Sequence, residues 1–200
     1  MMTARQGKVV WRCAILMVVL AIGGCAERAP YRPTVVSGGA SPVLAFQLGG
    51  IEILDETGGT GNGAVPADAF SVTPNQALQN WAAVRLRVAD GEPGLLRFHM
   101  TAATAERSSL DGTPGIKGWF TRDQAEQVSV SFAGRLEARR NDGSLIASAS
   151  AQAAAHRTFA EKTKPAVRRA GLDELVATAL AGFDREIQAR ARADMTSVLR

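Results

Sequence analysis

The sequence predicts an α+β domain in which two helices pack on one face of a sheet of about four strands, in the order β-α-β-β-β-α. Three observations predict this fold class. Several stretches alternate apolar and polar residues, as half-buried strands do, and two stretches repeat apolar residues at helical spacing. Turn signals rich in glycine, proline, asparagine and aspartate separate them. One domain spanning residues 43–200 is expected, long enough for a single hydrophobic core.

The first expected strand covers residues 44–53. Leu44, Phe46 and Leu48 alternate with small or polar neighbours, and the alternation resumes after the pair Gly49-Gly50. A glycine pair inside a strand pattern indicates a bulge or a kink. We therefore expect one strand with an interruption at this pair.

The first expected helix begins after Thr73. Residues 73–76 supply an N-cap threonine, a proline for the first helical position and a glutamine placed to complete a capping box. The pair Asp90-Gly91 is expected to end the helix. Its apolar stripe consists of Ala77, Trp81, Val84 and Val88.

Three further strands are expected within residues 96–102, 127–138 and 145–153, because each segment alternates apolar and polar positions. Residues 141–144 are a tight-turn signal, so the last two strands should form a hairpin. The inward residues of the last strand are mostly small, and a large element is therefore expected to pack over them. These residues are Leu145, Ala147, Ala149, Ala151 and Ala153.

A second, amphipathic helix is expected near the C-terminus and should lie across the sheet. Asp173 and Glu174 favour a helix start near them, and Glu186 with Arg190 forms a favourable pair one turn apart. Asp184 is expected to lie off the apolar stripe with the other charged residues. The stripe consists of Leu172, Leu175, Val176, Ala179, Leu180, Phe183 and Ile187.

The first 24 residues resemble an export signal. Arg5, Lys8 and Arg12 are basic, and no acidic residue precedes Glu27. Residues 13–22 form an unbroken apolar run of ten, which is the length of the apolar part of a signal peptide. A membrane-spanning helix needs about 20 such residues. Residues 1–24 are therefore expected to be removed from the mature protein.

The sequence Ile22-Gly23-Gly24-Cys25 resembles the bacterial lipobox, in which an aliphatic residue and two small residues precede a cysteine. Small residues let the peptidase approach the backbone, and the thiol is the group that lipid alkylates. Cleavage is expected between Gly24 and Cys25, with Cys25 carrying acyl chains such as palmitate. Residues 25–42, rich in proline and glycine, are expected to be a tether. The alternatives are an ordinary signal peptide with a chance cysteine and a short buried helix of a cytosolic protein.

Removal of the signal changes the charge and the cysteine count. Residues 1–24 contain three of the 23 Lys and Arg residues and none of the 19 Asp and Glu residues, so the formal side-chain charge falls from +4 to +1. No nucleic-acid partner is expected, because such proteins need a concentrated basic face. Cys13 leaves with the signal and Cys25 carries lipid, so neither a disulfide nor a cysteine metal ligand is expected.

Few residues could support catalysis. The two histidines, His99 and His156, lack the spacing of a zinc site, so no metal and no cofactor is expected. Strand alternation places His99 opposite Phe98 and Met100, facing solvent, and His156 is expected at the surface. The glycine-rich residues 58–63 lack the ending of a phosphate-binding loop. No catalytic residue and no enzymatic activity are therefore expected.

Two features could mark a contact surface. Trp119 and Phe120 are adjacent in a glycine-rich loop; exposed, they would contact a partner protein or lipid, and folded back they would close the end of the core. The acidic pair Asp55-Glu56 is not one of these two features and is expected to be solvated at a strand end. Four arginines near the hairpin could form a modest basic rim or could be the charges of a solvated sheet edge. They are Arg135, Arg139, Arg140 and Arg157.

The lipobox ending at Cys25, the short tether, one β-α-β-β-β-α domain and the amphipathic C-terminal helix together resemble the small auxiliary lipoproteins of ABC-type lipid or lipopolysaccharide transport systems. The resemblance covers residues 25 to about 195 and, outside the lipobox, is one of layout. It implies a protein without catalytic activity, anchored on the periplasmic side of the outer membrane, that binds an envelope protein or lipid. Ala26, in place of aspartate, implies the outer membrane by similarity to enterobacterial sorting, with inner-membrane retention as the alternative.

Three function hypotheses follow from these features. The first is a membrane-anchored periplasmic binding or assembly lipoprotein, whose partners are the membrane and an envelope protein or lipid. The second is a structural envelope lipoprotein that contacts peptidoglycan or a secretion complex. The third, an enzyme, requires His99 or His156 in a concave site with a carboxylate.

Overall fold

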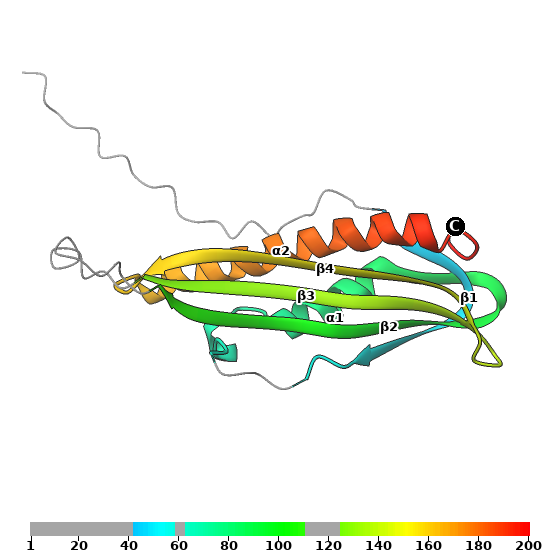
Figure 1. The fold of residues 1–200 in the computed structure, drawn as a ribbon, viewed down its shortest axis with the longest axis horizontal. Helices are drawn as coiled ribbons and strands as arrows, with labels where there is room; N and C mark the ends of the chain where they lie inside the picture. Colours follow the sequence, from blue (N-terminus) through cyan, green and yellow to red (C-terminus); the bar gives the residue numbers. More distant parts are fainter. Residues whose placement is uncertain (1–41, 59–62, 111–124) are drawn as a thin grey trace, which may run out of the picture. The chain divides into compact units, whose positions relative to one another are not determined.

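The computed structural model describes residues 42–58, 63–110 and 125–200, and these form an α+β fold, as predicted. The strands lie side by side in one sheet, with α2 running along them (Figure 1). A short 3-10 helix, η1, precedes the first α-helix. In chain order the elements are β1 (Leu44–Asp55), η1 (Ala67–Ala69), α1 (Pro74–Arg85), β2 (Leu86–Leu110), β3 (Ala125–Arg140), β4 (Leu145–Ala160) and α2 (Pro165–Asp194).

The sheet is mixed, with its long strands in the spatial order β1-β2-β3-β4. β1 is parallel to β2, because α1 lies between them in the chain, and the other two pairs are antiparallel. The C-terminus adds a fifth, strand-like segment: Leu199 pairs with Phe46, and the Arg200 N–H donates to the Ala45 carbonyl at 2.9 Å. The predicted four strands and their order were therefore incomplete, because these last residues are too few to show an alternating pattern.

The glycine pair interrupts β1, as predicted. The pairing of β1 with β2 shifts register between Gln47 and Leu48 and again between Leu48 and Gly50. Inward side chains before the shift are buried, whereas Ile51 and Ile53 beyond it are 38% and 40% exposed. The interruption thus separates a buried half of the strand from a more exposed half.

α1 begins as predicted. The Gln76 N–H donates to Thr73 Oγ1 at 3.3 Å, and the Thr73 N–H donates to Gln76 Oε1 at 3.2 Å. These two bonds complete the capping box, and Pro74 occupies the first turn, where its missing N–H costs nothing.

α1 ends at Arg85, before the predicted Asp90-Gly91. Leu86 is already extended, with φ −92° and ψ 128°, and it pairs with β1. Leu86 and Val88 fit a strand alternation as well as a helical stripe. Pairing with β1 decides between the two, which is a tertiary effect that local spacing does not contain.

β2 follows the predicted alternation only as far as a bulge. Leu96, Phe98 and Met100 are fully buried. The pairing with β3 then shifts register between Met100 and Ala102, and Ala105 is the next buried residue. Ala102, predicted to point inward, is only half-buried, because a bulge changes the side to which the following residues point.

β3 and β4 form the predicted hairpin, and Gly143 occupies its turn with φ +84°. Most of the small inward side chains of β4 lie against α2, as expected. Leu145 is an exception and is 49% exposed. It lies at the hairpin end of β4, where the pairing with β3 shifts register between Ala138 and Arg139.

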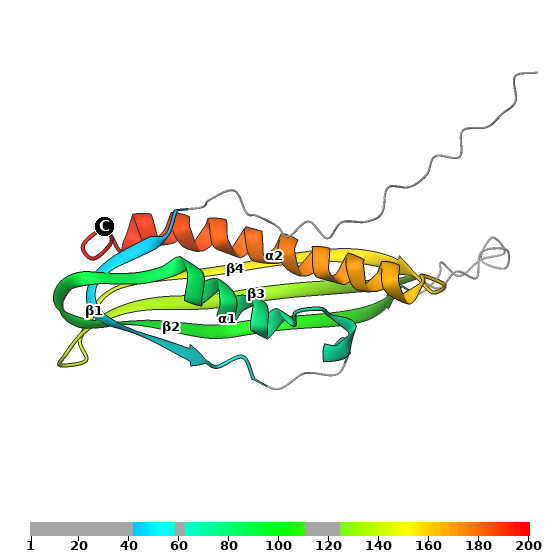
Figure 2. The ribbon, with the colours of Figure 1, turned by 180° about the vertical axis from the view of Figure 1, so that it is seen from behind.

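Both helices cover the same face of the sheet, as predicted (Figure 2). Trp81 of α1 meets Phe98 of β2 and Phe183 of α2 there, with ring centroids 5.4 Å and 5.0 Å away. Gly182 lets α2 approach β4, since a Cβ on it would stand 3.2 Å from the Cβ of Ala153. In the described part of the chain, no helix is both long enough and apolar enough to cross a membrane.

Asp184 of α2 was predicted to lie off the apolar stripe, but it is only 6% exposed. Trp81 Nε1–H donates to its Oδ1 at 2.8 Å, and Gln188 Nε2 donates to Oδ2 at 2.9 Å. Arg85 Nη2 lies 2.9 Å from Oδ2. The carboxylate is buried between the two helices because these donors offset its desolvation.

α2 begins at Pro165, well before the acidic pair Asp173 and Glu174 that was predicted to mark its start. Asp173 accepts hydrogen bonds from the N–H and the hydroxyl of Ser71, at 2.9 Å and 2.6 Å. Glu174 pairs with Arg157 of β4 at 2.6 Å. The two acids therefore attach α2 to its neighbours and do not cap it.

Candidate functional site

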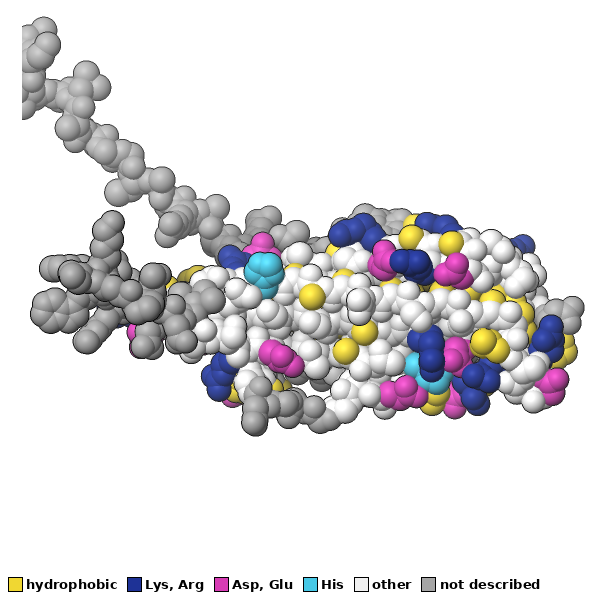
Figure 3. Space-filling view, in the orientation of Figure 1, with side chains coloured by type: hydrophobic (Ala, Val, Ile, Leu, Met, Phe, Trp, Pro, Cys, Tyr) yellow, Lys and Arg dark blue, Asp and Glu magenta, His cyan; other side chains and the backbone are white. Residues whose placement is uncertain are grey.

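Charged side chains gather on the face of the sheet away from the helices, near the β3–β4 hairpin. Strand alternation turns Arg97 and His99 of β2 away from the core, because the alternate residues Leu96 and Phe98 are buried. Figure 3, which views this face, shows acidic and basic side chains around a histidine. We name this group the open-face cluster, and it consists of Glu52, Glu56, Arg97, His99, Arg135, Glu137 and Arg139.

His99 is the buried centre of the open-face cluster, with only 8% of the residue exposed. Its Nδ1 lies 2.7 Å from Glu56 Oε1, and its Nε2 lies 3.6 Å from Glu137 Oε2. Nε2 has no hydrogen-bond partner among the described residues. His99 points away from the core, as predicted, but the prediction that it faces solvent is wrong, because charged side chains from neighbouring strands cover its ring.

Glu137 holds two arginines of the open-face cluster and is itself only 5% exposed. Arg139 Nε donates to its Oε2 at 2.8 Å, and Arg135 Nε lies 3.0 Å from its Oε1. Burial raises the pKa of Glu137, but the Arg139 hydrogen bond and the charges of both arginines and His99 lower it by more. The net result is a pKa below the ordinary value of 4.5. The carboxylate is therefore held in its ionised form.

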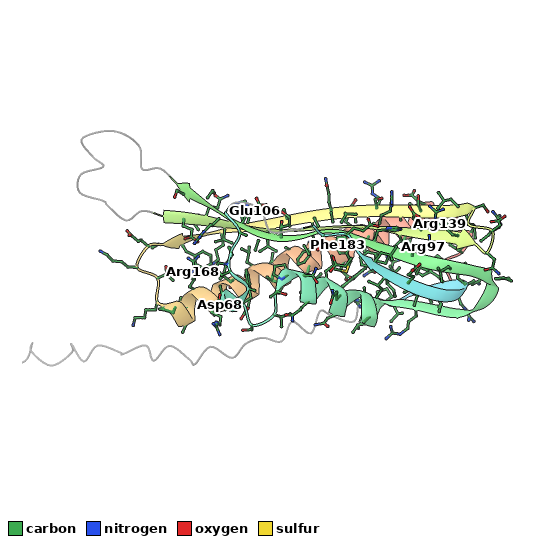
Figure 4. All side chains as sticks on the ribbon, turned by 90° about the horizontal axis from the view of Figure 1, so that it is seen from below. Asp68, Arg97, Glu106, Arg139, Arg168 and Phe183 are labelled. Atoms are coloured by element: carbon green, nitrogen blue, oxygen red, sulfur yellow. The ribbon has the colours of Figure 1, made fainter. Side chains whose placement is uncertain are left out.

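A hollow of about 500 Å³ adjoins the open-face cluster. It lies between the glycine interruption of β1, the first half of β2 and the β3–β4 turn. Figure 4 shows two of its arginines, Arg97 and Arg139, at the same end of the sheet. The lining residues are Arg97, Arg139 and Arg140 together with Gly49, Gly50, Pro93, Gly94, Leu95, Asn141 and Gly143.

The predicted basic rim is divided by the structure. Arg139 and Arg140 line the hollow, Arg135 is held by Glu137, and Arg157 pairs with α2 away from the hollow. Sequence reasoning missed Glu137, although its position between two arginines with side chains on the same strand face was a usable signal.

The other predicted site residues divide into two groups. His156 is exposed near the end of β4, as predicted. Gly24, Cys25, Trp119 and Phe120 lie outside the described residues, so cleavage, lipidation and partner contact stay predictions. Among the residues that the structure describes, no three His, Cys, Asp or Glu side chains are grouped as metal ligands would be.

His99 meets one part of the condition for an enzyme, because Glu56 and Glu137 flank its ring. It does not line the hollow, and its hydrogen bonds to described residues include no hydroxyl that it could activate as a nucleophile. The hollow itself offers guanidinium groups and glycine backbone. Guanidinium groups form charge-assisted hydrogen bonds with carboxylate or phosphate oxygens.

Comparison with known proteins assigns no family: no family model matches the sequence, and no curated protein matches it. Among solved structures, the chain is similar to a minor lipoprotein from Acinetobacter baumannii, with 13% identity and a TM-score of 0.37, over 74% of this chain and 94% of that one. It is also similar to the rare lipoprotein B from Shewanella oneidensis, with 12% identity and a TM-score of 0.36, over 72% and 96%. Similarities this remote transfer no ligand, partner or site residue to this chain.

Proposed function

We propose that this protein is a bacterial lipoprotein that is exported, cut before Cys25 and anchored by acyl chains on that cysteine. The observation that carries the proposal is the N-terminal order of basic residues, an apolar run of ten and the sequence Ile22-Gly23-Gly24-Cys25. Several acyl chains on one residue hold a protein on a membrane far more durably than a single chain does. The proposed location is the periplasmic face of the outer membrane, with inner-membrane retention as the alternative that membrane fractionation separates.

The test is metabolic labelling with an alkyne analogue of palmitate. Cys25→Ser should abolish the label and should accumulate the uncut precursor. Cys25 is both the residue that carries the acyl chains and the residue before which the peptidase cuts. Cys13→Ser is the matched control and should leave labelling and cleavage unchanged. If the Cys25→Ser variant were labelled as strongly as the protein that retains Cys25, the proposal would be contradicted.

We further propose that the anchored domain binds an envelope protein or lipid and has no catalytic activity. The arginine-lined hollow supports binding, since it presents charged donors with no nucleophile among the lining residues. The resemblance of the whole layout to auxiliary lipoproteins favours envelope lipid transport as the process served.

A photo-crosslinking amino acid tests this binding role in native membranes. Placed at Arg140 beside the hollow, it should capture an envelope protein or a lipid, and placed at Arg190 of α2, outside the lining, it should not. Equal products from both positions, or none from either, would count against a binding role for the hollow. Co-sedimentation with purified sacculi would instead favour a structural lipoprotein.

A further inference from the structure

The hollow carries an excess of positive charge. Three of its lining residues are arginines and, among the lining residues, none is acidic. Arg135 stands next to them on the same face, so four arginines lie at this end of the sheet. Glu52 and Glu137 form ion pairs with Arg97, Arg135 and Arg139, and the Asp142 carboxylate of the hairpin turn interacts with the charge of Arg140.

The carboxylates leave specific donors unused. Arg97 donates through Nε to Glu52 Oε2 at 2.9 Å, and its two terminal nitrogens form no hydrogen bond to a described residue. Arg140 has one long hydrogen bond, from Nη1 to the Ser144 hydroxyl at 3.3 Å. The free nitrogens of Arg97 and Arg140 are therefore available to a ligand, while Glu52 fixes the position of one guanidinium.

Arg139 differs from these two arginines because all three of its nitrogens are engaged. Its Nε and Nη2 contact Glu137 Oε2 at 2.8 Å and 2.7 Å, and its Nη1 donates to the Gly143 carbonyl at 2.8 Å. It contributes a positive charge that is held in place by these contacts.

Glycines provide a bare backbone beside the arginines. A Cβ on Gly94 would stand 2.6 Å from the Arg139 carbonyl oxygen, so no side chain fits there. Gly49 and Gly50 on β1 likewise place no side chain in the lining. The space that a Gly94 side chain would need is filled by β3 and Leu48, so the arginine side chains supply the groups that could bind an anion here.

We propose that the hollow binds a phosphate group, with Arg97 and Arg140 as hydrogen-bond donors and Arg139 as a fixed positive charge. Arg97, Arg135, Arg139 and Arg140 outnumber the carboxylates of Glu52, Glu137 and Asp142 beside them, and guanidinium groups fit pairs of phosphate oxygens. The phosphate belongs either to a soluble ester or to a lipid headgroup. A phosphate group would be the ligand of the binding function proposed above. The phosphate site rests on that proposed function only for the source of the phosphate.

Calorimetric titration of the full-length chain in neutral detergent micelles with inorganic phosphate, at low ionic strength, tests the proposal. Saturable binding is expected. Arg97→Gln and Arg140→Gln should each weaken it about tenfold, because each removes charge-assisted hydrogen bonds. Arg190→Gln is the matched control: it removes one positive charge on α2, where Arg190 pairs with Glu186 at 2.8 Å, and should leave phosphate affinity unchanged.

A second variant separates recognition from folding. Arg97→Lys keeps the positive charge but removes the planar guanidinium group with its paired donors. It should therefore weaken phosphate binding while the melting temperature stays unchanged. Absence of saturable binding, or an equal loss in Arg190→Gln, would overturn the proposal.

Two competition arms identify the source of the phosphate. Displacement by vesicles containing phosphatidic acid, but not by phosphatidylcholine vesicles, identifies a headgroup, and displacement by glycerol phosphate alone identifies a soluble ester. The Cys25→Ser variant should bind inorganic phosphate as tightly as the protein that retains Cys25. A failure of the acylation proposal is thereby distinguished from a failure of the phosphate site.

Discussion

Buried polar groups on the two faces of the sheet differ in how completely they are hydrogen-bonded. On the face covered by the helices, the Asp184 carboxylate is surrounded by donors from α1 and α2, and the side chains around it are apolar. On the open face, His99 and Glu137 are about as deeply buried, but His99 Nε2 has no hydrogen-bond partner among the described residues, and Arg97 keeps two terminal nitrogens without one. The Asp184 carboxylate on the covered face therefore has its hydrogen-bond donors within the described residues, whereas the open face keeps donors without a described acceptor.

The largest expected effect lies on the covered face. Phe98 is fully buried and contacts the rings of Trp81 and Phe183, so Phe98→Ala should lower the free energy of unfolding by about 3–5 kcal/mol. Urea unfolding followed by circular dichroism measures this change. Val84→Ala is the control, because Val84 of α1 is 61% exposed and its truncation should change stability by less than about 0.5 kcal/mol. Similar losses in both variants would remove the distinction between core and surface on this side of the sheet.

A smaller effect is expected at Asp184. Asp184→Ala should cost about 2–3 kcal/mol, because the buried Trp81 Nε1–H loses its acceptor and the nearby Arg85 loses its counter-charge. Asp184→Asn keeps an acceptor for Trp81 and should cost roughly half as much. The same urea titration measures both variants. An unchanged stability in Asp184→Ala would show that the covered face does not depend on this carboxylate.

Local patterns contain much of the fold. The alternation through β3 correctly places Val128, Val130, Phe132, Leu136 and Ala138 in the core, and the capping box locates the start of α1. The end of α1 was not predictable in the same way, because Leu86 fits both a helical stripe and a strand. Only the pairing of Leu86 with Leu44 in β1 selects the strand.

The candidate site was less predictable than the fold. Alternation tells which face of the sheet a residue occupies, but it does not tell which residues of other strands lie beside it. His99 and Glu56 are 43 residues apart in the chain, and Trp81 and Asp184 are 103 apart. Two arginines of the hollow, Arg139 and Arg140, belonged to the predicted basic rim. The third, Arg97, comes from β2 and joins them only through the pairing of β2 with β3.

The smallest expected effect concerns the open face and depends on pH. The pKa of Glu137 is lowered in the folded protein, so the unfolded chain binds the proton more readily, and stability must rise with pH across this range. The contribution of Glu137 is fully present above about pH 4.5, its ordinary pKa, and is lost as the pH falls through the lower folded value. Glu137→Gln should therefore cost about 1–2 kcal/mol at pH 7 and progressively less below pH 4.5.

Urea titrations at pH 7 and at pH 3 measure this difference. Ser148→Ala is the matched control, because Ser148 of β4 is the cross-strand partner of Glu137 and does not titrate, so any cost of this variant should be the same at both pH values. If Glu137→Gln showed the same cost at both values, the ion pairs of Glu137 would not stabilise the open face. The contrast between the two faces would then rest on apolar packing alone.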